Sequence, residues 1–369
     1  MKVAILTMSN GINYGNRLQN YAVQKVLESV GCEVETIKNF TSQRITSKSD
    51  PKRIIKYALA SIYEKVPFVD IKFLNRILRN VNFNKFTKNY IKQTKYIITK
   101  DYIPTNICNM YDYFICGSDQ IWNPEFKINS EIDFLTFANK GQRIAYAPSF
   151  GVSKLPEYCI DSYKKWINEI DCLSVREQVG ADIIKELTGR NAIVLVDPTL
   201  MLSKDEWLSI AKKPKIKLNK KYILTYFLGK KDNITENRIN KIAKKYDLEV
   251  INLLDISHKF IYSADPSEFL WLINNSELVC TDSFHGSVFS LIFQKAFMVF
   301  ERKDNFLSMN SRLDTLLAKF DMESRRESNI INEDEVFNID FSKVNRIINN
   351  EKDKTFKYIK EALNIKDER

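Results

Sequence analysis

The stretch KVAILTMSNGINYGNRLQNYAVQKVLESVGCEVETIKNF (residues 2–40) decides the fold class. It opens with an apolar run, Lys2–Met8, and passes through a glycine-containing loop. A segment with apolar residues at helical spacing follows and ends at Gly31, and an alternating run, Cys32–Phe40, comes next. Strand, helix and strand in this order make a βαβ unit, which is typical of parallel sheets. The sequence therefore predicts an α/β protein.

The alternation of strands and helices continues in two series. The first ends near residue 200, in a polar and lysine-rich stretch at residues 199–221, and the second begins at Tyr222. A chain of 369 residues is long enough for two cores. We therefore predict two Rossmann-like domains, residues 1–200 and 201–369, that face each other across a cleft. From Phe341 onward the pattern predicts a C-terminal helix.

The net charge of +10 is concentrated in one segment of the first domain. Between Pro51 and Lys100 there are twelve lysines and arginines but only two acids, and the strand rhythm is interrupted. We predict a helical insertion at about residues 51–100, with two amphipathic helices around Pro67. Its charged faces would be solvated on the simplest interpretation. The alternative is a surface that docks on an anionic membrane through cations such as Lys52, Arg53, Lys56, Arg76 and Arg79.

Several classes of protein are disfavoured by composition and motif content. No apolar run approaches the roughly 20 residues of a membrane span, and the N-terminus lacks the features of a signal peptide. We expect a cytoplasmic protein, with peripheral contact at the inner face of the cell membrane as the alternative for the insertion. The six cysteines form no C-x-x-C pair, and no His/Cys/Asp/Glu spacing suggests a metal site. We expect neither a metal nor a cofactor, and no nucleic-acid partner.

The most informative candidate residue is His285, in the segment DSFHGSVFSLIF (residues 282–293). Ligands of α/β proteins bind at the carboxyl ends of strands, and His285 lies between an expected strand at 277–282 and an expected helix at 287–294. Backbone amides at a helix start favour an anion, and imidazole exchanges a proton near neutral pH. Gly286 would let a ligand approach the backbone. A histidine that only caps the helix or packs in the turn is the alternative.

Two further strand ends offer residues for a second ligand. The glycine loop after the first strand ends with Gly15 and Asn16, and we expect Asn16 to cap the helix, although a purely structural turn is equally consistent. The segment FICGSDQIWN (residues 114–123) provides Asp119, Gln120 and Trp122. Carboxylate, amide and indole together would form a platform for a sugar. The alternative places Asp119 at a helix cap and Trp122 in the core.

Two charged residues follow the next strands of the first domain. Arg176 comes after the strand that ends in SVRE, and its planar guanidinium could hold a carboxylate or a phosphate, although most arginines lie at the surface. Asp197, in VLVDPT, reads as a turn former rather than a catalyst because proline follows it.

Six segments taken together resemble the polysaccharide pyruvyl transferase family: NYGNRLQNYAVQ, FICGSDQIWN, AYAPSFG, SVRE, VDPTLML and DSFHGSVFSLIF. They occur in the family's order between Met1 and about Phe320. The resemblance implies a glycosyltransferase B-like fold, with the acceptor on the first domain and the donor on the second. It also implies transfer of a pyruvyl group from phosphoenolpyruvate to hydroxyls of a sugar in a polysaccharide or its lipid-linked precursor. The products would be a pyruvate ketal and phosphate.

The resemblance also assigns roles to individual residues. His285 matches the catalytic histidine, and Arg176 matches an arginine associated with phosphoenolpyruvate. Many members carry arginine two residues before the histidine, where this chain has Ser283. We expect Arg312, and after it Arg302, to supply the missing cation. The donor set is therefore Arg176, Ser283, Gly286, Arg302 and Arg312, and the acceptor set is Gly15, Asn16, Asp119, Gln120 and Trp122.

Two other functions stay open at this point. A nucleotide-sugar-dependent glycosyltransferase of the same fold would use the second domain for a nucleoside diphosphate, with the same histidine near its phosphates. A non-catalytic binder of an anionic polymer is supported by the positive charge alone.

Overall fold

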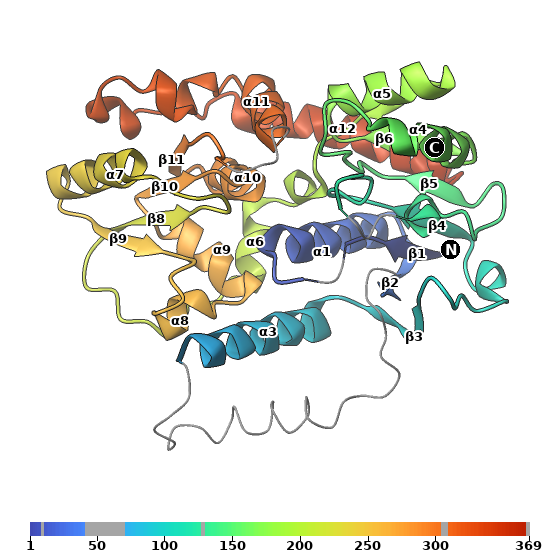
Figure 1. Ribbon diagram of the computed structural model, residues 1–369, viewed down its shortest axis with the longest axis horizontal. Helices are drawn as coiled ribbons and strands as arrows, with labels where there is room; N and C mark the ends of the chain where they lie inside the picture. The colour runs from blue at the N-terminus through green and yellow to red at the C-terminus, as the bar shows by residue number, and fades with distance from the viewer. Residues whose placement is uncertain (9–10, 41–70, 127–129, 304–308, 367–369) are drawn as a thin grey trace.

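The computed structural model describes residues 1–8, 11–40, 71–126, 130–303 and 309–366, and it contains two parallel α/β domains (Figure 1). In the described part of the chain, the first sheet has seven parallel strands in the order β3-β2-β1-β4-β5-β6-β7. These strands are β1 Lys2–Leu6, β2 Glu33–Asn39, β3 Gln93–Ile98, β4 Tyr113–Cys116, β5 Arg143–Ala145, β6 Cys172–Val175 and β7 Ile193–Val194.

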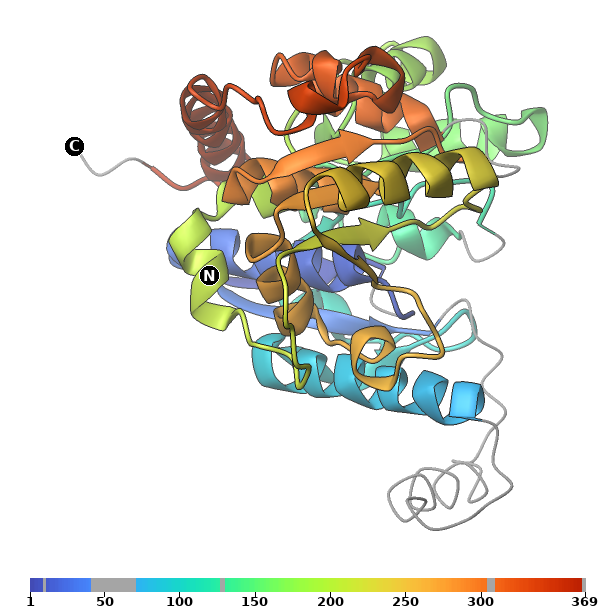
Figure 2. The ribbon, with the colours of Figure 1, turned by 90° about the vertical axis from the view of Figure 1, so that its left-hand side faces the viewer.

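The second sheet is smaller and is also parallel. Its described strands have the order β11-β10-β8-β9. They are β8 Tyr222–Tyr226, β9 Glu249–Asn252, β10 Leu278–Thr281 and β11 Ala296–Val299. Figure 2 shows this domain end on, with its sheet covered by helices on both faces.

Helices pack against both sheets and bury their apolar faces in the cores. The helices of the first domain and of the connection between the domains are α1 Tyr14–Ser29, α3 Ile71–Tyr90, α4 Ile160–Asn168, α5 Gln178–Thr188 and α6 Lys204–Ile210. Those of the remaining chain are α7 Asn233–Lys245, α8 Lys259–Tyr262, α9 Pro266–Asn274, α10 Phe284–Phe293, α11 Met309–Lys319 and α12 Val344–Ala362.

In each sheet, successive strands are first added on one side and then on the other. The point at which this order switches faces the other domain. In the first sheet this switch lies between β1 and β4, and in the second it lies between β8 and β10. Loops at the carboxyl ends of the strands diverge at such a switch and leave a crevice in which ligands bind. The fold therefore brings the start of α1 and the segment after β4 opposite the start of α10.

Helix α3 belongs to the predicted insertion, but it connects the two domains through hydrogen bonds. The amides of Asn75 and Asn82 donate to the carbonyl oxygens of Ile256 (2.9 Å) and Ser263 (2.7 Å), both in the second domain. Figures 1 and 2 agree that α3 runs beneath α8. The insertion therefore also contributes to the contact between the domains.

Two predictions about the insertion need correction. Residues 93–98, counted as part of the helical segment, form the edge strand β3, because their alternation was hidden among lysines. Arg79, considered as a membrane-facing cation, is buried and donates to the hydroxyl of Tyr14 (3.0 Å) and to the carbonyl of Tyr262. Arg76 is exposed, whereas Lys52, Arg53 and Lys56 lie outside the described residues.

The C-terminal helix was assigned to the second domain, but α12 spans both. Near its middle, Glu351 pairs with Lys319 of α11 at 2.9 Å. Near its end, the buried hydroxyl of Tyr358 donates to the carbonyl of Ala145 in β5 at 2.7 Å. Apolar residues of α12 join the same core cluster as α1, which explains why the helix packs against the first domain. Within the described ranges, no helix is long and apolar enough to cross a membrane.

Candidate active site

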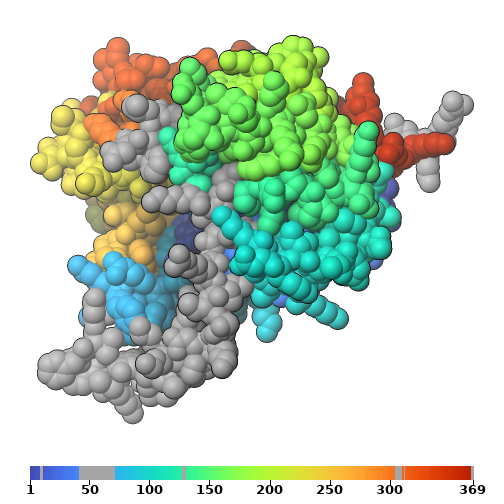
Figure 3. All heavy atoms as spheres, turned by 45° about the vertical axis from the view of Figure 1, so that its right-hand side comes forward, coloured from blue at the N-terminus to red at the C-terminus, as the bar shows by residue number. Residues whose placement is uncertain are grey.

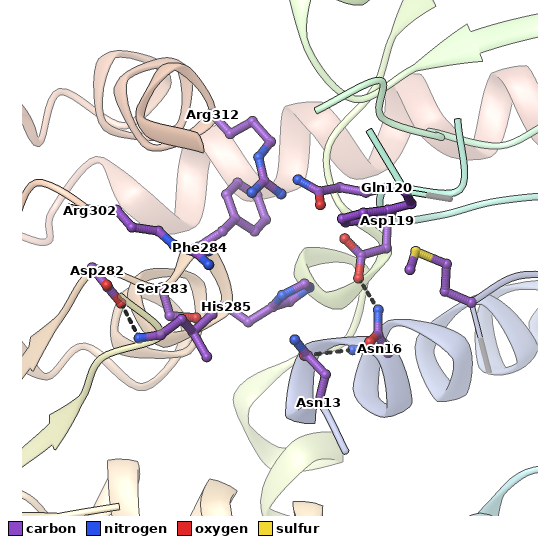
Figure 4. A pocket seen from close by; sticks show the side chains of 13 residues that line it. Asn13, Asn16, Asp119, Gln120, Asp282, Ser283, Phe284, His285, Arg302 and Arg312 are labelled. Atoms are coloured by element: carbon purple, nitrogen blue, oxygen red, sulfur yellow. Dashed lines mark hydrogen bonds between the residues drawn. The ribbon is translucent and has the colours of Figure 1, made fainter. Parts of the chain in front are cut away.

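A cavity of about 90 Å³ lies where the two switch points face each other (Figure 4). The first domain contributes Asn13, Asn16, Asp119 and Gln120, and the second contributes Asp282, Ser283, His285, Arg302 and Arg312. Figure 3 shows the two domains side by side, the second in yellow to orange and the first in cyan to green. We refer to this cavity as the cleft pocket.

His285 lies in the first turn of α10, rather than in the turn before it as predicted. The helix begins at Phe284 because Ser283 is its N-cap and accepts a hydrogen bond from the Gly286 amide at 3.4 Å. Ser283 itself lines the cleft pocket. Gly286 does not have the predicted role of opening the backbone to the donor. A Cβ at this position would lie 2.6 Å from Oγ1 of Thr281, so glycine is needed for packing inside the second domain.

Gly15 lies directly against His285 and is the contact between the two switch points. Helix α1 begins at Tyr14 and is capped by Asn13, not by Asn16 as predicted; the Asn13 side chain accepts from the Asn16 amide at 3.3 Å. A Cβ on Gly15 would overlap the imidazole ring of His285, with Nδ1 the nearest atom. Glycine is therefore required because the ring occupies the space of its side chain.

The substitution Gly15→Ala is expected to displace His285 and lower turnover roughly tenfold to hundredfold, since overpacking a filled site costs about 1–3 kcal/mol. The measurement is the steady-state rate together with the thermal midpoint. Ser29→Ala, at the far end of the same helix, serves as the control and should behave like the unmodified protein. Unchanged turnover in Gly15→Ala would show that the ring position is not needed.

The carboxylate of Asp197 lies on the other side of the His285 imidazole. Its Oδ2 lies 3.5 Å from Nε2 of His285 and 2.8 Å from Nη1 of Arg176. Its Oδ1 accepts from the amide (3.0 Å) and the hydroxyl (2.7 Å) of Thr199. Burial alone would raise the pKa of Asp197, but His285, Arg176 and Thr199 outweigh it and hold that pKa well below its usual range. The residue caps a 3₁₀ turn, as its sequence suggests, and its carboxylate also lies beside the imidazole of His285, which its sequence does not show.

Arg176, which the sequence predicts to bind the donor, is not among the residues that line the cleft pocket. It is buried and lies close to three carboxylates: Nη1 is 3.5 Å from Asp119 as well as 2.8 Å from Asp197, and Nε is 3.5 Å from Glu177. Its guanidinium also stacks on the ring of Phe284, 4.5 Å from the centroid. Burial lowers the pKa of Arg176, but the three carboxylates raise it by more. In this structure it pairs with three acids, of which Asp119 also lines the cleft pocket.

Arg302 and Arg312 are the described arginines on the wall of the cleft pocket. Their side chains extend from the second domain toward its centre (Figure 4). Burial, followed by repulsion from Arg176, lowers the pKa of Arg312 to about 10. The hydrogen-bonding pattern requires the amide oxygen of Gln120 to face this guanidinium, where it accepts at 2.7 and 2.8 Å from Nη2 and Nη1. Two arginines thus lie on the wall of the cleft pocket.

Carboxylates face these cations from both domains. Asp119 accepts a hydrogen bond from the side chain of Asn16, so both residues lie on the first-domain wall (Figure 4). Asp282, which the sequence did not single out, accepts from the backbone amides of Leu228 and Gly229, both at 2.7 Å. Burial raises the pKa of Asp282. Its position at the end of β10, beside Ser283, is the signal that could have identified it.

Trp122 is not part of a sugar platform. The side chain is fully buried, with its ring stacked on Phe134 at 5.0 Å between centroids and the tilted ring of Phe150 at 5.4 Å. Its indole nitrogen donates to the carbonyl of Asp133 at 3.1 Å. The core alternative considered for this residue therefore describes its position. Among the described residues, no group of three or more His, Cys, Asp or Glu side chains could hold a metal ion.

Solved structures are similar to this chain at low sequence identity. A protein assigned as a UDP-N-acetylglucosamine 2-epimerase from Listeria monocytogenes is 11% identical, with alignment over 99% of this chain and 97% of its own and a TM-score of 0.51. UDP-GlcNAc 2-epimerase from Neisseria meningitidis, solved with UDP-GlcNAc, is 10% identical over 99% and 100% of the two chains, with a TM-score of 0.47. No curated protein matches the sequence. The predicted α/β fold with two Rossmann-like domains of glycosyltransferase B type is confirmed.

The sequence itself identifies the family. Residues 13–305 match the polysaccharide pyruvyl transferases, and this range includes β1-to-α1 loop residues, the segment after β4, Asp197 and His285. The match covers most of the chain and both walls of the cleft pocket except Met8 and Arg312. The chain belongs to the polysaccharide pyruvyl transferase family.

Proposed function

We propose that this protein transfers a pyruvyl group from phosphoenolpyruvate to two hydroxyls of a sugar in a polysaccharide or its lipid-linked precursor, and that the cleft pocket is the reaction site. The observation that carries the proposal is the placement of His285, with Asp197 behind it and Arg302 and Arg312 on the same pocket. Phosphoenolpyruvate carries a carboxylate and a phosphate, and two arginines provide matching charges.

The size of the pocket favours a small donor. Its volume of about 90 Å³ is room for a few water molecules, whereas pockets for drug-sized ligands measure roughly 300–1,000 Å³. A nucleotide sugar would need the larger space. Phosphoenolpyruvate needs far less, and the acceptor hydroxyls would enter from the first-domain side, past Asn16 and Asp119.

The arrangement supports a stepwise addition. With Nε2 of His285 facing Asp197, Nδ1 is the nitrogen that exchanges a proton with substrate. His285 as imidazolium protonates the methylene carbon of phosphoenolpyruvate while a sugar hydroxyl bonds to C2 and gives its proton to Asp119. Positive character that develops at C2 is stabilised by the surrounding carboxylates. The C2–O bond to phosphate then breaks, and the second hydroxyl bonds to C2 and passes its proton to the departing phosphate.

The test is phosphate release from phosphoenolpyruvate in the presence of a panel of sugars and oligosaccharides, with nucleotide sugars assayed in parallel. The proposal expects phosphate release that depends on an acceptor, together with a ketal carbon in the product by NMR. Sugar transfer from a nucleotide sugar, with no consumption of phosphoenolpyruvate by any acceptor, would refute it.

The arginines of the pocket make a separate prediction. Arg312→Gln is expected to weaken phosphoenolpyruvate binding roughly 10–100-fold, because a charge-assisted hydrogen bond in a buried site contributes about 1.5–3 kcal/mol. Equilibrium binding of phosphoenolpyruvate measures this directly, and Arg302→Gln should act in the same direction. Arg346→Gln, at an exposed position of α12, is the matched control. Normal donor affinity in Arg312→Gln would remove this residue from the donor site.

A further inference from the structure

A second cavity lies in the first domain, next to the cleft pocket. It measures about 450 Å³ and is formed by α1, α3 and strand β2, with Arg17, Lys38, Phe40, Asn84, Thr87 and Lys88 among its walls. Figure 1 shows α3 running below α1, with β2 beside them. The reaction proposed above assigns no role to this cavity. We refer to it as the α1–α3 cavity.

The walls of the α1–α3 cavity are positively charged. Arg17, Lys38 and Lys88 are three of its lining residues, and none of the described residues that line it is acidic. The three cations come from three different elements, α1, β2 and α3, so the fold gathers them from separate parts of the chain. Their ammonium and guanidinium groups would repel one another less with an anion between them.

Arg17 is the deepest of the three cations. Its side chain is only 5% exposed, and burial lowers its pKa to about 10. Its guanidinium therefore lies on the inner wall of the cavity. Lys38 is half-buried and Lys88 is exposed, so the cavity is open to solvent on their side. A ligand could therefore enter past the lysines and reach the arginine.

The α1–α3 cavity and the cleft pocket share the first turn of α1. Gly15 contacts His285 and Asn16 lines the cleft pocket, whereas Arg17, the next residue, lines the second cavity. Successive side chains of a helix point about 100° apart, and a helix with its side chains is about 10–12 Å wide. The two cavities therefore lie on adjacent sides of one helix end. A sugar with a charged group attached to it would span that distance.

We propose that the α1–α3 cavity binds a phosphate or diphosphate group carried by the acceptor sugar, while the sugar ring reaches His285 in the cleft pocket. This inference rests on the proposed function for the identity of the acceptor, but the anion site itself does not. Phosphate fits better than a single carboxylate because the three cations exceed the charge of one carboxylate. Arginine binds phosphate oxygens in a planar fork and lysine as a point charge.

The first test is calorimetric titration with inorganic pyrophosphate at low salt. The cleft pocket and the α1–α3 cavity should each take one ion, so two sites are expected. Lys38→Gln/Lys88→Gln should lose one site, or bind there about tenfold more weakly, the factor expected when two partly exposed ion pairs are removed. The control Lys85→Gln/Lys140→Gln removes the same charge from exposed positions of the same domain that do not line the cavity, and it should keep both sites.

The second test compares acceptors once phosphoenolpyruvate-dependent turnover is established. For one acceptor sugar, the diphosphate-linked form and the neutral methyl glycoside are assayed with each double variant. Lys38→Gln/Lys88→Gln should raise KM about tenfold for the diphosphate-linked form, with kcat and the KM of the methyl glycoside unchanged. The control double variant should change neither KM.

The outcomes separate this inference from the proposed function. Pyrophosphate binding that weakens equally in both double variants, or in neither, overturns the anion site. A lost pyrophosphate site with equal KM values for the two acceptor forms shows an ion site that the acceptor does not use, and it overturns the acceptor assignment. Absence of phosphoenolpyruvate consumption with every acceptor, while pyrophosphate still binds at two sites, overturns the proposed function and leaves the anion site standing.

Discussion

His285→Asn is expected to lower the turnover of phosphoenolpyruvate by roughly 10²–10⁴-fold, the usual contribution of a positioned general acid. Asparagine keeps a polar side chain in the first turn of α10 but cannot donate a proton to carbon. The fold should survive, because Ser283 still caps the helix. Phosphate release gives kcat, and the thermal midpoint and circular dichroism show whether the variant is folded.

The second histidine provides the matched control. His258 is exposed and lies before the short helix α8, away from the residues that line the cleft pocket. His258→Asn should therefore have normal kcat and KM. A folded His285→Asn variant with normal turnover would exclude His285 from proton transfer, and Asp282 would become the next candidate for the acid.

Asp197→Asn is the other substitution with a large expected effect. The change is nearly isosteric, but it removes the charge that faces both His285 and Arg176. In hydrolases, loss of the carboxylate that orients a catalytic histidine lowers kcat by about 10⁴, and we expect a loss of roughly 10²–10⁴ here. Because Asp197 acts through His285, kcat should fall while the KM for phosphoenolpyruvate stays nearly constant.

Asp197→Asn should also destabilise the fold, since breaking a buried ion pair costs about 3–5 kcal/mol. Stability and catalysis are separated by assaying well below the midpoint of unfolding. Asp205→Asn, at an exposed position in α6, is the control and should change neither quantity. Normal kcat in a destabilised Asp197→Asn variant would mean that Asp197 only neutralises Arg176.

The residues that line the cleft pocket could be predicted where the signal in the sequence is local. Parallel strands follow from apolar runs, and a parallel strand brings whatever follows it to the edge where ligands bind. This is why Asn16, Asp119, Gln120, Ser283 and His285 could be selected from their places after strands, and all of them line the cleft pocket. Local patterns also showed the two series of strands that form the two domains.

The contacts between the domains could not be predicted in the same way. The pairing of Asp197 with His285 joins positions that are far apart in the chain, and it depends on how one domain faces the other. Arg176 looked like a ligand for an anion because two of its three carboxylate neighbours, Asp119 and Asp197, come from other segments of the chain. Trp122 shows the same limit, since a strand-end aromatic residue can point into the core as well as out of it.

Helix α12 has a consequence for how the protein is made. The carbonyl of Ala145 receives its hydrogen bond from Tyr358, 213 residues later in the chain. At a synthesis rate of about 5–20 residues per second, the first domain waits roughly 10–40 s on the ribosome before this partner exists. During that time the surface later covered by α12 is exposed to solvent or to a chaperone. A nascent chain stalled before residue 344 would therefore carry an incomplete first domain, although all of its strands had already been translated.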